Sequence, residues 1–521
     1  MATYYVTTSI PYVNGTPHLG HALEFVQADV LARYHRLRGD ATRFQTGTDD
    51  NALKNVQAAE AAGLPTQAFV DRNATAFAAL RGPLALSFDD FIRTSGNPAH
   101  AAGAARLWAR CLAGGDIAKR TYAGRYCVGC EQFYTEDELV DGLCPEHLRP
   151  PELVAEENYF FRLSRYAERL HALIASGTLR IEPAGRRNEI LRFIAGGLRD
   201  FSISRSWTRA RGWGIPVPDD PEQVMYVWWD ALINYITALD FADDGPEYAR
   251  FWRDGDQRVH VIGKGIIRFH AVYWPAMLLS AGLPLPTTIY VHEYVTVDGQ
   301  KISKSLGNAI DPTMLAARFG TDPLRYWLLR DVPRAEDGDF TLARLAGRAN
   351  SELANGLGNL LQRTLGMIAR WCGGRIPHGT GTATLLHNIA ASLPEQIDAA
   401  LDRFDFRAAL AVIWELVGAA NRYVDDTAPW LLAKRAAGGD ADAARDLDTA
   451  LAALAEALRL IGHHLAPFLP DASARILAQL GDAGASQHTD TDAETWGDTL
   501  AGRQIQPAGP LFPRIELTAG E

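Results

Sequence analysis

Two histidines near the start of the chain, His18 and His21, have side chains and a spacing that suit phosphate chemistry. They are three residues apart at the start of a helix-like pattern, which follows a strand-like run at residues 4–8 and a loop rich in proline. A helix N-terminus attracts phosphate, and two imidazoles there can stabilise charge that builds on a phosphoryl group. A histidine pair on a helix is also common in proteins without such chemistry, so the pair alone leaves both interpretations open.

A second candidate phosphate-binding element is the segment KISKS at residues 301–305. The turn signal Asp298-Gly299 places its two lysines, Lys301 and Lys304, on a loop just after a strand-like run. Lysines separated by small hydroxyl residues on a mobile loop can close over a polyphosphate. Such a loop is ordinary surface in most proteins, and it becomes informative only together with the histidine pair.

Three cysteines and one histidine form a candidate metal site. Cys127, Cys130, Cys144 and His147 follow the spacing C-x2-C-x13-C-x2-H. Three thiolates and one imidazole suit zinc, whereas a redox C-x-x-C, the competing interpretation, leaves Cys144 and His147 unexplained. Four protein ligands leave no open position on the ion, so we predict a structural zinc and not a catalytic one.

The elements that position the histidines alternate between strand-like and helix-like patterns from residue 4 to about residue 116. This alternation predicts a parallel α/β sheet, in which ligands bind beyond the carboxyl ends of the strands. Asp49 follows the second predicted strand and could hold an amino group there, although a helix N-cap explains it equally well on local grounds. A second α/β half follows the zinc motif, so we expect one domain inserted into another.

From about residue 342 to residue 477 the pattern is helical and predicts a helix bundle. Within it Asn355, Asn359 and Arg363 recur every four residues and therefore share one helix face. Two amides and a guanidinium can read the edges of unstacked bases, and Trp430 could stack on one. A polar outer helix face explains the same spacing and is the simpler interpretation of spacing alone.

The composition is that of an ordinary globular protein, with 521 residues, 47% apolar and 22% charged, enough for about three domains. A net charge of −11 argues against indiscriminate binding to nucleic acid, although seven arginines in residues 186–211 could form a local basic face or a solvated surface. Five cysteines without a visible signal peptide suit a reducing cytoplasm. No apolar stretch is long enough to predict a membrane span.

Together these features resemble class I aminoacyl-tRNA synthetases, and their details resemble the methionyl-tRNA synthetases. The family motif that ends in HxGH stands here as His18-Leu19-Gly20-His21, and the motif usually written KMSKS stands as residues 301–305. The resemblance extends over essentially the whole chain through WGIPVP, YVWWDA, FHAVYWPAML, SKSLGN and LFPRIE. No large editing insertion is evident.

The resemblance implies an α/β fold with a Rossmann-like parallel sheet, a zinc-bearing inserted connective domain and a following α-helical bundle. The expected divisions are residues 1–115 and 225–297 for the two halves of the catalytic domain, 116–224 for the connective insertion, 298–341 for the lysine-loop segment and 342–521 for the anticodon-binding domain. Because no dimerisation module follows LFPRIE, we expect a monomer.

The implied reaction has two steps. The carboxylate of methionine attacks the α-phosphate of ATP to give methionyl-adenylate, and the 3′-terminal adenosine of tRNA-Met then takes the methionyl group. His18 and His21 would stabilise the phosphate charge, and Lys301 and Lys304 would hold the leaving pyrophosphate. Mg²⁺ normally accompanies the ATP. The residues implied for ATP binding are Gly20, Lys301, Ser303, Lys304 and Ser305.

The resemblance also implies a methionine pocket and an anticodon-reading face. Aromatic and aliphatic walls suit a flexible, polarizable thioether, and Asp49 would hold the α-amino group. The implied pocket residues are Ile10, Tyr12, Asp49, Trp228, Ala231, Tyr235, Ile266 and His270. The implied anticodon residues are Asn355, Asn359, Arg363 and Trp430, which replaces the interpretation of a plain polar face.

The sequence departs from the family pattern at four positions around the nucleotide. Asn51-Ala52 replaces a His-Gly pair, Gly265 replaces an aspartate expected to bind the ribose, and Glu293 replaces a glycine. Losing a charge-assisted hydrogen bond costs about 1.5–3 kcal/mol, which would weaken ATP binding roughly ten- to a hundredfold. Three hypotheses follow: a divergent methionyl-tRNA synthetase, a paralogue that serves another acceptor or acts as a resistant duplicate, or a silent tRNA-binding protein. Intact motif histidines and lysines argue against the third.

Overall fold

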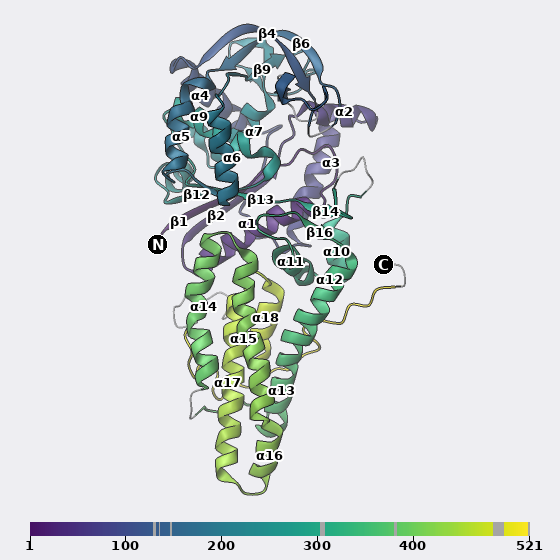
Figure 1. Ribbon diagram of the computed structural model, residues 1–521, viewed down its shortest axis with the longest axis vertical. Helices are drawn as coiled ribbons and strands as arrows, with labels where there is room; N and C mark the ends of the chain where they lie inside the picture. Colours follow the sequence, from purple (N-terminus) through teal and green to yellow (C-terminus); the bar gives the residue numbers. More distant parts are fainter. Residues whose placement is uncertain are drawn as a thin grey trace. The chain divides into compact units, whose positions relative to one another are not determined.

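The structure, a computed structural model, describes residues 1–128, 132–134, 136–145, 148–302, 308–379, 383–482 and 494–518 (Figure 1). The chain divides into two compact units. The first unit comprises Met1–Ala28, Ala41–Arg81 and Ser87–His292, and the second comprises Asp29–Asp40, Gly82–Leu86 and Glu293–Glu521.

A six-stranded sheet forms the centre of the first unit. Its strands lie in the order β3-β2-β1-β12-β13-β7, and every neighbouring pair is parallel. The strands are β1 (Thr3–Thr8), β2 (Ala41–Thr48), β3 (Asp90–Arg93), β7 (Arg180–Glu182), β12 (Gln257–Gly263) and β13 (Thr288–His292). The predicted parallel α/β sheet is therefore confirmed. The strand order reverses between β1 and β12, and such a reversal opens a ligand crevice at the carboxyl ends of the strands.

The helices of the first unit follow from apolar faces that pack on this sheet. Helix α7 is buried along its whole length, and Trp229 from its first turn meets Trp108 of α4 edge to face, with ring centroids 5.3 Å apart. Helix α1 ends before Gly39, whose φ of 82° suits glycine at a helix C-terminus. The helices are α1 (Leu19–Leu37, which continues into the second unit), α2 (Leu53–Ala61), α3 (Thr66–Ala78), α4 (Pro98–Ala113), α5 (Ala167–Ala175), α6 (Ala184–Ala195), α7 (Val227–Thr237), α8 (Pro246–Tyr248) and α9 (Trp274–Ser280).

The segment between α4 and α7 adds two antiparallel sheets. The larger one has the order β5-β4-β6-β8, with β4 (Ile117–Cys127), β5 (Gln132–Tyr134), β6 (Glu152–Phe161) and β8 (Phe201–Ser202). The smaller one has the order β10-β11-β9, with β9 (Ser204–Ser206), β10 (Pro216–Val217) and β11 (Asp220–Met225). The same segment also supplies β7, the edge strand of the parallel sheet, so it is joined to that sheet by backbone hydrogen bonds as well as by its connections.

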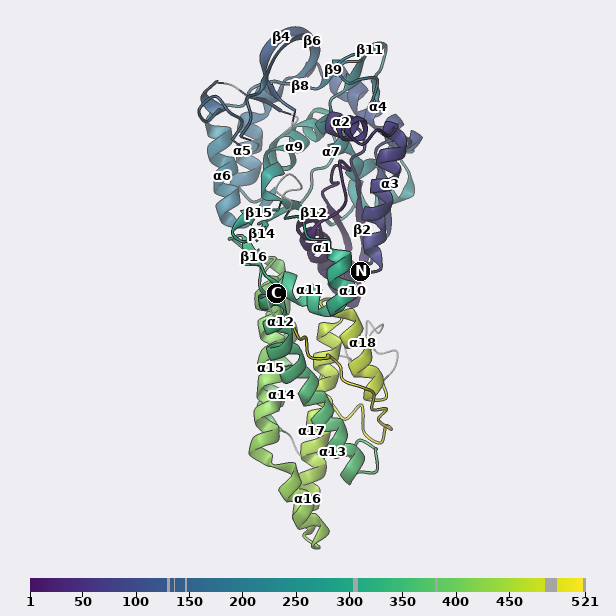
Figure 2. The ribbon, with the colours of Figure 1, turned by 90° about the vertical axis from the view of Figure 1, so that its right-hand side faces the viewer.

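The second unit is mainly helical, which confirms the predicted helical region (Figure 2). Its long segment, Glu293–Glu521, begins with a small sheet of β14 (Val295–Val297), β15 (Gln300–Lys301) and β16 (Gly338–Phe340). The helices are α10 (Pro312–Phe319), α11 (Thr321–Arg330), α12 (Leu342–Arg348), the π-helical η9 (Ala349–Gly358), α13 (Asn359–Trp371), α14 (Thr384–Asp402), α15 (Phe406–Thr427), α16 (Pro429–Ala437), α17 (Ala441–Leu465) and α18 (Pro470–Gln479). Among the described residues, no helix combines the length and the apolar character needed to cross a membrane.

Candidate active site

The loops after β1 and β2 run side by side at the carboxyl edge of the parallel sheet. Asp49, directly after β2, forms a parallel bridge with Tyr12, and its backbone N–H donates to Pro11 O at 2.9 Å. This pairing holds two of the predicted site residues next to each other. It also places them at the edge where the strand order predicts a ligand crevice.

His18 and His21 stack on each other at the N-terminus of α1, with ring centroids 3.8 Å apart. The backbone N–H of Gly20 donates to His18 Nδ1 at 3.1 Å, and the backbone N–H of His18 donates to His21 Nδ1 at 3.1 Å. Both Nδ1 atoms are therefore acceptors, so each neutral ring carries its proton on Nε2. A Cβ at position 20 would lie 3.0 Å from His18 Cε1, which explains glycine there. The pair can present two Nε2–H donors to an anion.

Four rings form an aromatic wall, and three of them belong to predicted methionine-binding residues. The Trp228 ring stacks on Phe269 at 3.7 Å, and the Tyr12 and His270 rings meet Trp228 edge on at 6.3 and 6.5 Å. Ile10, Ala231 and Tyr235 are buried, whereas Tyr12 and Ile266 are partly exposed. Phe269 was not predicted, although it directly precedes His270 in the chain; it lies on the π-helical segment η7 (Phe269–Tyr273).

Hydrogen bonds define the proton positions on the buried histidines of this pocket. His270 Nδ1 lies 3.0 Å from Ile266 O, so it carries the proton, and Nε2 accepts the Tyr235 hydroxyl hydrogen at 2.7 Å. Burial lowers the pKa of His270 to about 4 and raises the pKa of Tyr235 well above its usual 10. Burial and the neighbouring His270 also lower the pKa of His260. Tyr235, His260 and His270 are therefore uncharged at neutral pH.

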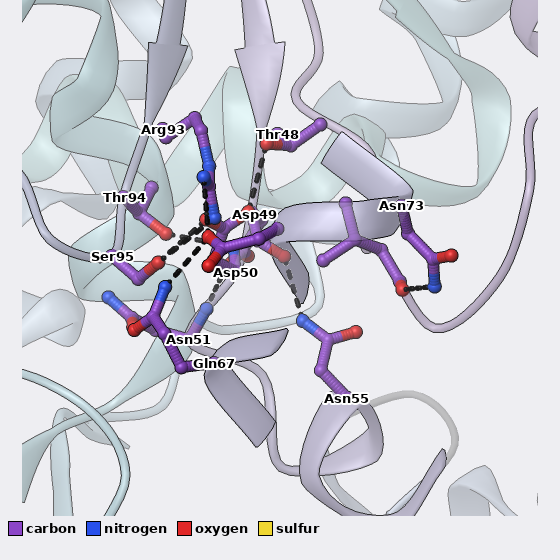
Figure 3. Close-up of polar contacts among 12 residues, drawn as sticks. Thr48, Asp49, Asp50, Asn51, Asn55, Gln67, Asn73, Arg93, Thr94 and Ser95 are labelled. Carbon is purple, nitrogen blue, oxygen red and sulfur yellow. Dashed lines mark hydrogen bonds and ion pairs between the residues drawn. The ribbon is translucent and has the colours of Figure 1, made fainter. Parts of the chain in front are cut away.

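Asp49 supplies a carboxylate beside this uncharged pocket. The side chain is 1% exposed, and Asp49 Oδ1 accepts from the backbone N–H of Asn51 at 3.1 Å. The Asn55 amide donates to Asp49 O at 2.9 Å and holds the loop from the other side (Figure 3). Above the loop, Lys54 Nζ lies 3.7 Å from the Tyr12 ring centroid. An oriented carboxylate of this kind can hold an ammonium group.

Glu24 was not predicted, and it joins α1 to two strands of the sheet. Its carboxylate is buried, accepts from Ser9 Oγ at 2.5 Å and lies 2.8 Å from His292 Nε2. Ser9 follows β1 and His292 ends β13, so this one side chain fixes the start of α1 at the crevice. Glu24 follows His21 by three residues, and this helical spacing was the available signal.

The asparagine at the first departure from the family pattern has partners within the protein. Asn51 Nδ2 donates to Asp230 Oδ2 at 2.6 Å, and His100 Nε2 lies 2.6 Å from Asp230 Oδ1. His100 and Asp230 are buried, so the Asn51 amide completes the hydrogen bonding of a buried carboxylate. Of the other departures, Ala52 and Glu293 are buried and Gly265 is exposed in η6 (Lys264–Ile266).

The lysine loop is only partly described. The predicted turn is confirmed: Asp298 and Gly299 have φ angles of 53° and 71° and join β14 to β15. Lys301 is in β15, and its side chain is outside the described part of the chain, as are Ser303, Lys304 and Ser305.

Two of the four predicted zinc ligands can be located. Cys127 and Cys144 are buried in one small cluster with Tyr134, which brings together one cysteine from each of the two predicted ligand pairs. Cys130 and His147 lie outside the described residues. Among the described residues, no group of three or more potential ligands is present, and none of the described cysteines forms a disulfide bond.

The predicted anticodon residues lie on exposed helix surfaces. Asn355 and Asn359 are exposed on η9 and α13, and Arg363, which is one third exposed, lies 3.0 Å from Asp425 Oδ1. Asn355 Oδ1 accepts from Arg514 at 3.2 Å. Trp430 is 44% exposed at the start of α16, a helix that contacts α13. An indole exposed to this extent is available for stacking.

Two family models match the chain and together cover nearly all of it. Residues 4–149 and 147–365 match the family described as tRNA synthetases class I (M). Residues 376–519 match the family described as the anticodon binding domain of methionyl tRNA ligase.

Similar proteins cover the chain over its full length. The methionine--tRNA ligase of Synechocystis is 41% identical over 538 residues, which is 100% of this chain and 99% of the relative. The methionine--tRNA ligase of Mycobacterium tuberculosis is 42% identical over 525 residues, which is 99% of this chain and 98% of the relative. A solved structure of the Mycobacterium tuberculosis methionyl-tRNA synthetase in complex with methionyl-adenylate has a TM-score of 0.93 and 41% identity, and it covers 99% of this chain and 100% of its own.

Proposed function

The chain belongs to the methionyl-tRNA synthetases of class I, and from this membership we propose that it is an enzyme that activates methionine with ATP and transfers it to tRNA-Met. One observation supports the assignment to this site: the stacked His18–His21 pair follows β1, and Phe269, which stacks on Trp228, follows β12, and these are the two strands between which the strand order reverses. A phosphate-directed group and a pocket suited to a thioether side chain therefore share one unit of the protein.

The amino acid is held by charge at one end and by aromatic contact at the other. Asp49 binds the α-ammonium group. The methionine side chain packs against the rings of Tyr12, Trp228 and His270. The remaining pocket residues are Ile10, Ala231, Tyr235 and Ile266. The uncharged Tyr235–His270 pair matters here because an ionised group would disfavour the apolar thioether. Contacts between sulfur and aromatic rings contribute about 0.3–1.5 kcal/mol each.

In the activation step a methionine carboxylate oxygen forms a bond to the α-phosphorus, and the bond from that phosphorus to the bridging oxygen breaks. Negative charge grows on the α-phosphate oxygens and on the departing pyrophosphate. The Nε2–H groups of His18 and His21 donate to the α-phosphate oxygens, a contact that strengthens as charge develops. Lys301 and Lys304, with Ser303 and Ser305, bind the pyrophosphate, and Gly20 leaves room for the adenosine. Mg²⁺ supplies additional charge neutralisation on ATP when it is bound.

In the transfer step a ribose hydroxyl of the terminal adenosine attacks the methionyl carbonyl, and AMP leaves. Recognition of the correct tRNA falls to the second unit, where Asn355, Asn359 and Arg363 present polar groups and Trp430 an exposed ring. We propose these four as the anticodon-reading residues.

The zinc site is proposed as a scaffold. Cys127, Cys130, Cys144 and His147 would hold the ion, and the joint burial of Cys127 and Cys144 fits this role. The ion would hold together the tip of the inserted segment, residues 116–224, while residues 1–115 and 225–297 form the catalytic halves. Residues 298–341 then form the lysine-loop segment, and residues 342–521 the anticodon-binding domain. We also propose that the enzyme works in the cytoplasm as a monomer.

Charging of tRNA tests this proposal. Purified protein with methionine and ATP should aminoacylate initiator and elongator tRNA-Met, and sedimentation should give the mass of one chain. Failure to charge either tRNA, with zinc present, would overturn the assignment. Replacing both His18 and His21 with alanine should abolish activation while leaving the fold intact, because both rings are partly exposed.

A further inference from the structure

A cavity in the first unit, lined by other residues than the proposed methionine pocket, has walls suited to a flat, uncharged, hydrogen-bonding ligand. It measures about 470 Å³, within the range of about 300–1,000 Å³ typical of ligand pockets. Its lining comes from the loop after β2, the start of α3, the loop after β3 with the start of α4, and the loop that leads into β10. None of its lining residues carries a charged side chain; they are Asn51, Gln67, Thr94, Ser95, Gly96, Asn97, Pro98, Ala101, Gly212, Trp213, Gly214, Ile215 and Pro216.

Trp213 gives this cavity a rigid aromatic wall. Its indole N–H donates to Asp50 O at 2.9 Å, which fixes the orientation of the ring. Asp50 is itself held by Arg93 and by Ser95 Oγ at 2.7 Å, and its backbone N–H donates to Thr94 Oγ1 at 2.9 Å (Figure 3). An aromatic ring fixed in this way can stack on a flat ligand without losing conformational entropy on binding.

The polar side chains of the cavity keep unused hydrogen-bonding capacity of both kinds. Asn51 uses its amide N–H on Asp230, and Gln67 uses its amide N–H on Asp71, so each retains a carbonyl oxygen that can accept. Asn97 uses its carbonyl oxygen to cap α4, so its amide N–H groups can donate. The Thr94 hydroxyl accepts from Asp50 and retains its hydrogen. Donors and acceptors beside a stacking surface match the edge and the face of a nucleobase.

The position of the cavity close to the proposed methionine site indicates which part of the tRNA would supply the nucleobase. Asn51 lines the cavity, and its backbone N–H also donates to Asp49 Oδ1, so a single residue separates the cavity from the proposed ammonium-binding carboxylate. Arg211, which precedes the lining residue Gly212, is exposed and forms an ion pair with Glu60. We propose that this cavity binds an unstacked base in the single-stranded 3′ end of the substrate tRNA, next to the terminal adenosine. This inference rests on the proposed aminoacylation, and it assigns a recognition site that activation of methionine does not use.

Filling the cavity tests the proposal. Ala101→Phe projects a ring into the cavity from α4, while Ala102→Phe places the same ring on the exposed side of the same helix and is the matched control. Gln67→Ala removes one acceptor from an exposed residue. We expect methionine-dependent ATP–pyrophosphate exchange without tRNA to stay within about twofold of wild type in all three variants. We expect the rate of transfer from preformed methionyl-adenylate to tRNA to fall about tenfold in Ala101→Phe, the cost of about one lost stacking contact, and to remain normal in Ala102→Phe.

A scan of the tRNA keeps the test independent of protein folding. Wild-type enzyme is given tRNA-Met in which each unpaired 3′ nucleotide before the terminal adenosine is made abasic in turn. One position should lose about tenfold in transfer, and that loss should shrink in Gln67→Ala. Normal transfer by Ala101→Phe, or equal use of every abasic tRNA by wild type, would overturn the proposed base site while leaving the proposed function standing. Absence of any charging by wild type with intact tRNA-Met would instead overturn the proposed function.

Discussion

Replacing Tyr235 with phenylalanine isolates one hydrogen bond in the proposed methionine pocket. The substitution keeps the ring and removes the hydroxyl that donates to His270 Nε2 at 2.7 Å. His270 is 1% exposed, and its Nδ1 already donates to Ile266 O, so the ring cannot rotate to find another donor without breaking that bond. The variant therefore leaves a buried acceptor unsatisfied.

The magnitude follows from the two ways in which the protein could respond. Leaving a buried acceptor unpaired costs about 1–3 kcal/mol. Protonating His270 instead would cost about 4 kcal/mol at pH 7, because its pKa is about 4 and each pH unit is worth about 1.4 kcal/mol. Neutral His270 without a partner on Nε2 is therefore lower in free energy than protonated His270. Without the tyrosine hydroxyl, the His270 ring should lose its fixed position against Trp228.

Exchange of pyrophosphate at varied methionine concentration measures the consequence. We expect Tyr235→Phe to raise the KM for methionine about tenfold, to leave the KM for ATP unchanged and to lower the free energy of unfolding by about 1–2 kcal/mol. Tyr166→Phe is the matched control, since it removes a tyrosine hydroxyl bonded to Asp116 in the inserted segment. If both variants lose stability and both keep the wild-type KM for methionine, Tyr235 is structural only and the pocket assignment is refuted.

Three further predictions concern other parts of the chain. Burial lowers the pKa of His464 to about 3, so below about pH 6.5 the unfolded state binds more protons than the folded state. As pH falls to 4, wild type should lose about 3 kcal/mol of stability relative to His464→Leu, measured by chemical denaturation. Parallel pH profiles of the two proteins would contradict this. Trp430→Ala should lower kcat/KM for tRNA-Met about tenfold without changing methionine activation, whereas Leu431→Ala, at a neighbour that is also exposed, should change neither; equal effects would refute anticodon stacking. Purified protein should contain about one zinc per chain, and Cys144→Ser should lose the metal and lower the thermal midpoint; metal content unchanged in that variant would exclude Cys144 as a ligand.

The parts of the fold that could be predicted are those set by local pattern. Alternating strand-like and helix-like segments predict the parallel sheet, because neighbouring parallel strands must be joined by a crossover, which is usually a helix. The edge strand β7, Arg180–Glu182, was not predicted. It is three residues long and pairs with β13 more than a hundred residues later, so its apolar pattern is too short to distinguish it from a loop.

In the site, too, local spacing could be predicted from the sequence, whereas contacts between distant residues could not. The spacing of His18 and His21 places them together on one helical turn, and their stacking follows from that spacing. The bond between Asn51 and Asp230 spans 179 residues and depends on how the loop after β2 meets α7. A pattern of single residues carries no information about such a pairing. The family pattern therefore identifies Asn51 as a departure, but it could not predict that the side chain bonds to Asp230.

The central claim is that this site activates methionine, and ATP–pyrophosphate exchange with each standard amino acid, without tRNA, tests it most directly. We predict exchange that depends on methionine, falls to background in the variant that lacks both His18 and His21, and is absent with the other amino acids. Exchange with a different amino acid alone would contradict the claim and would support a paralogue that uses another substrate. No exchange with any amino acid, with or without tRNA-Met, would contradict catalysis by this site altogether.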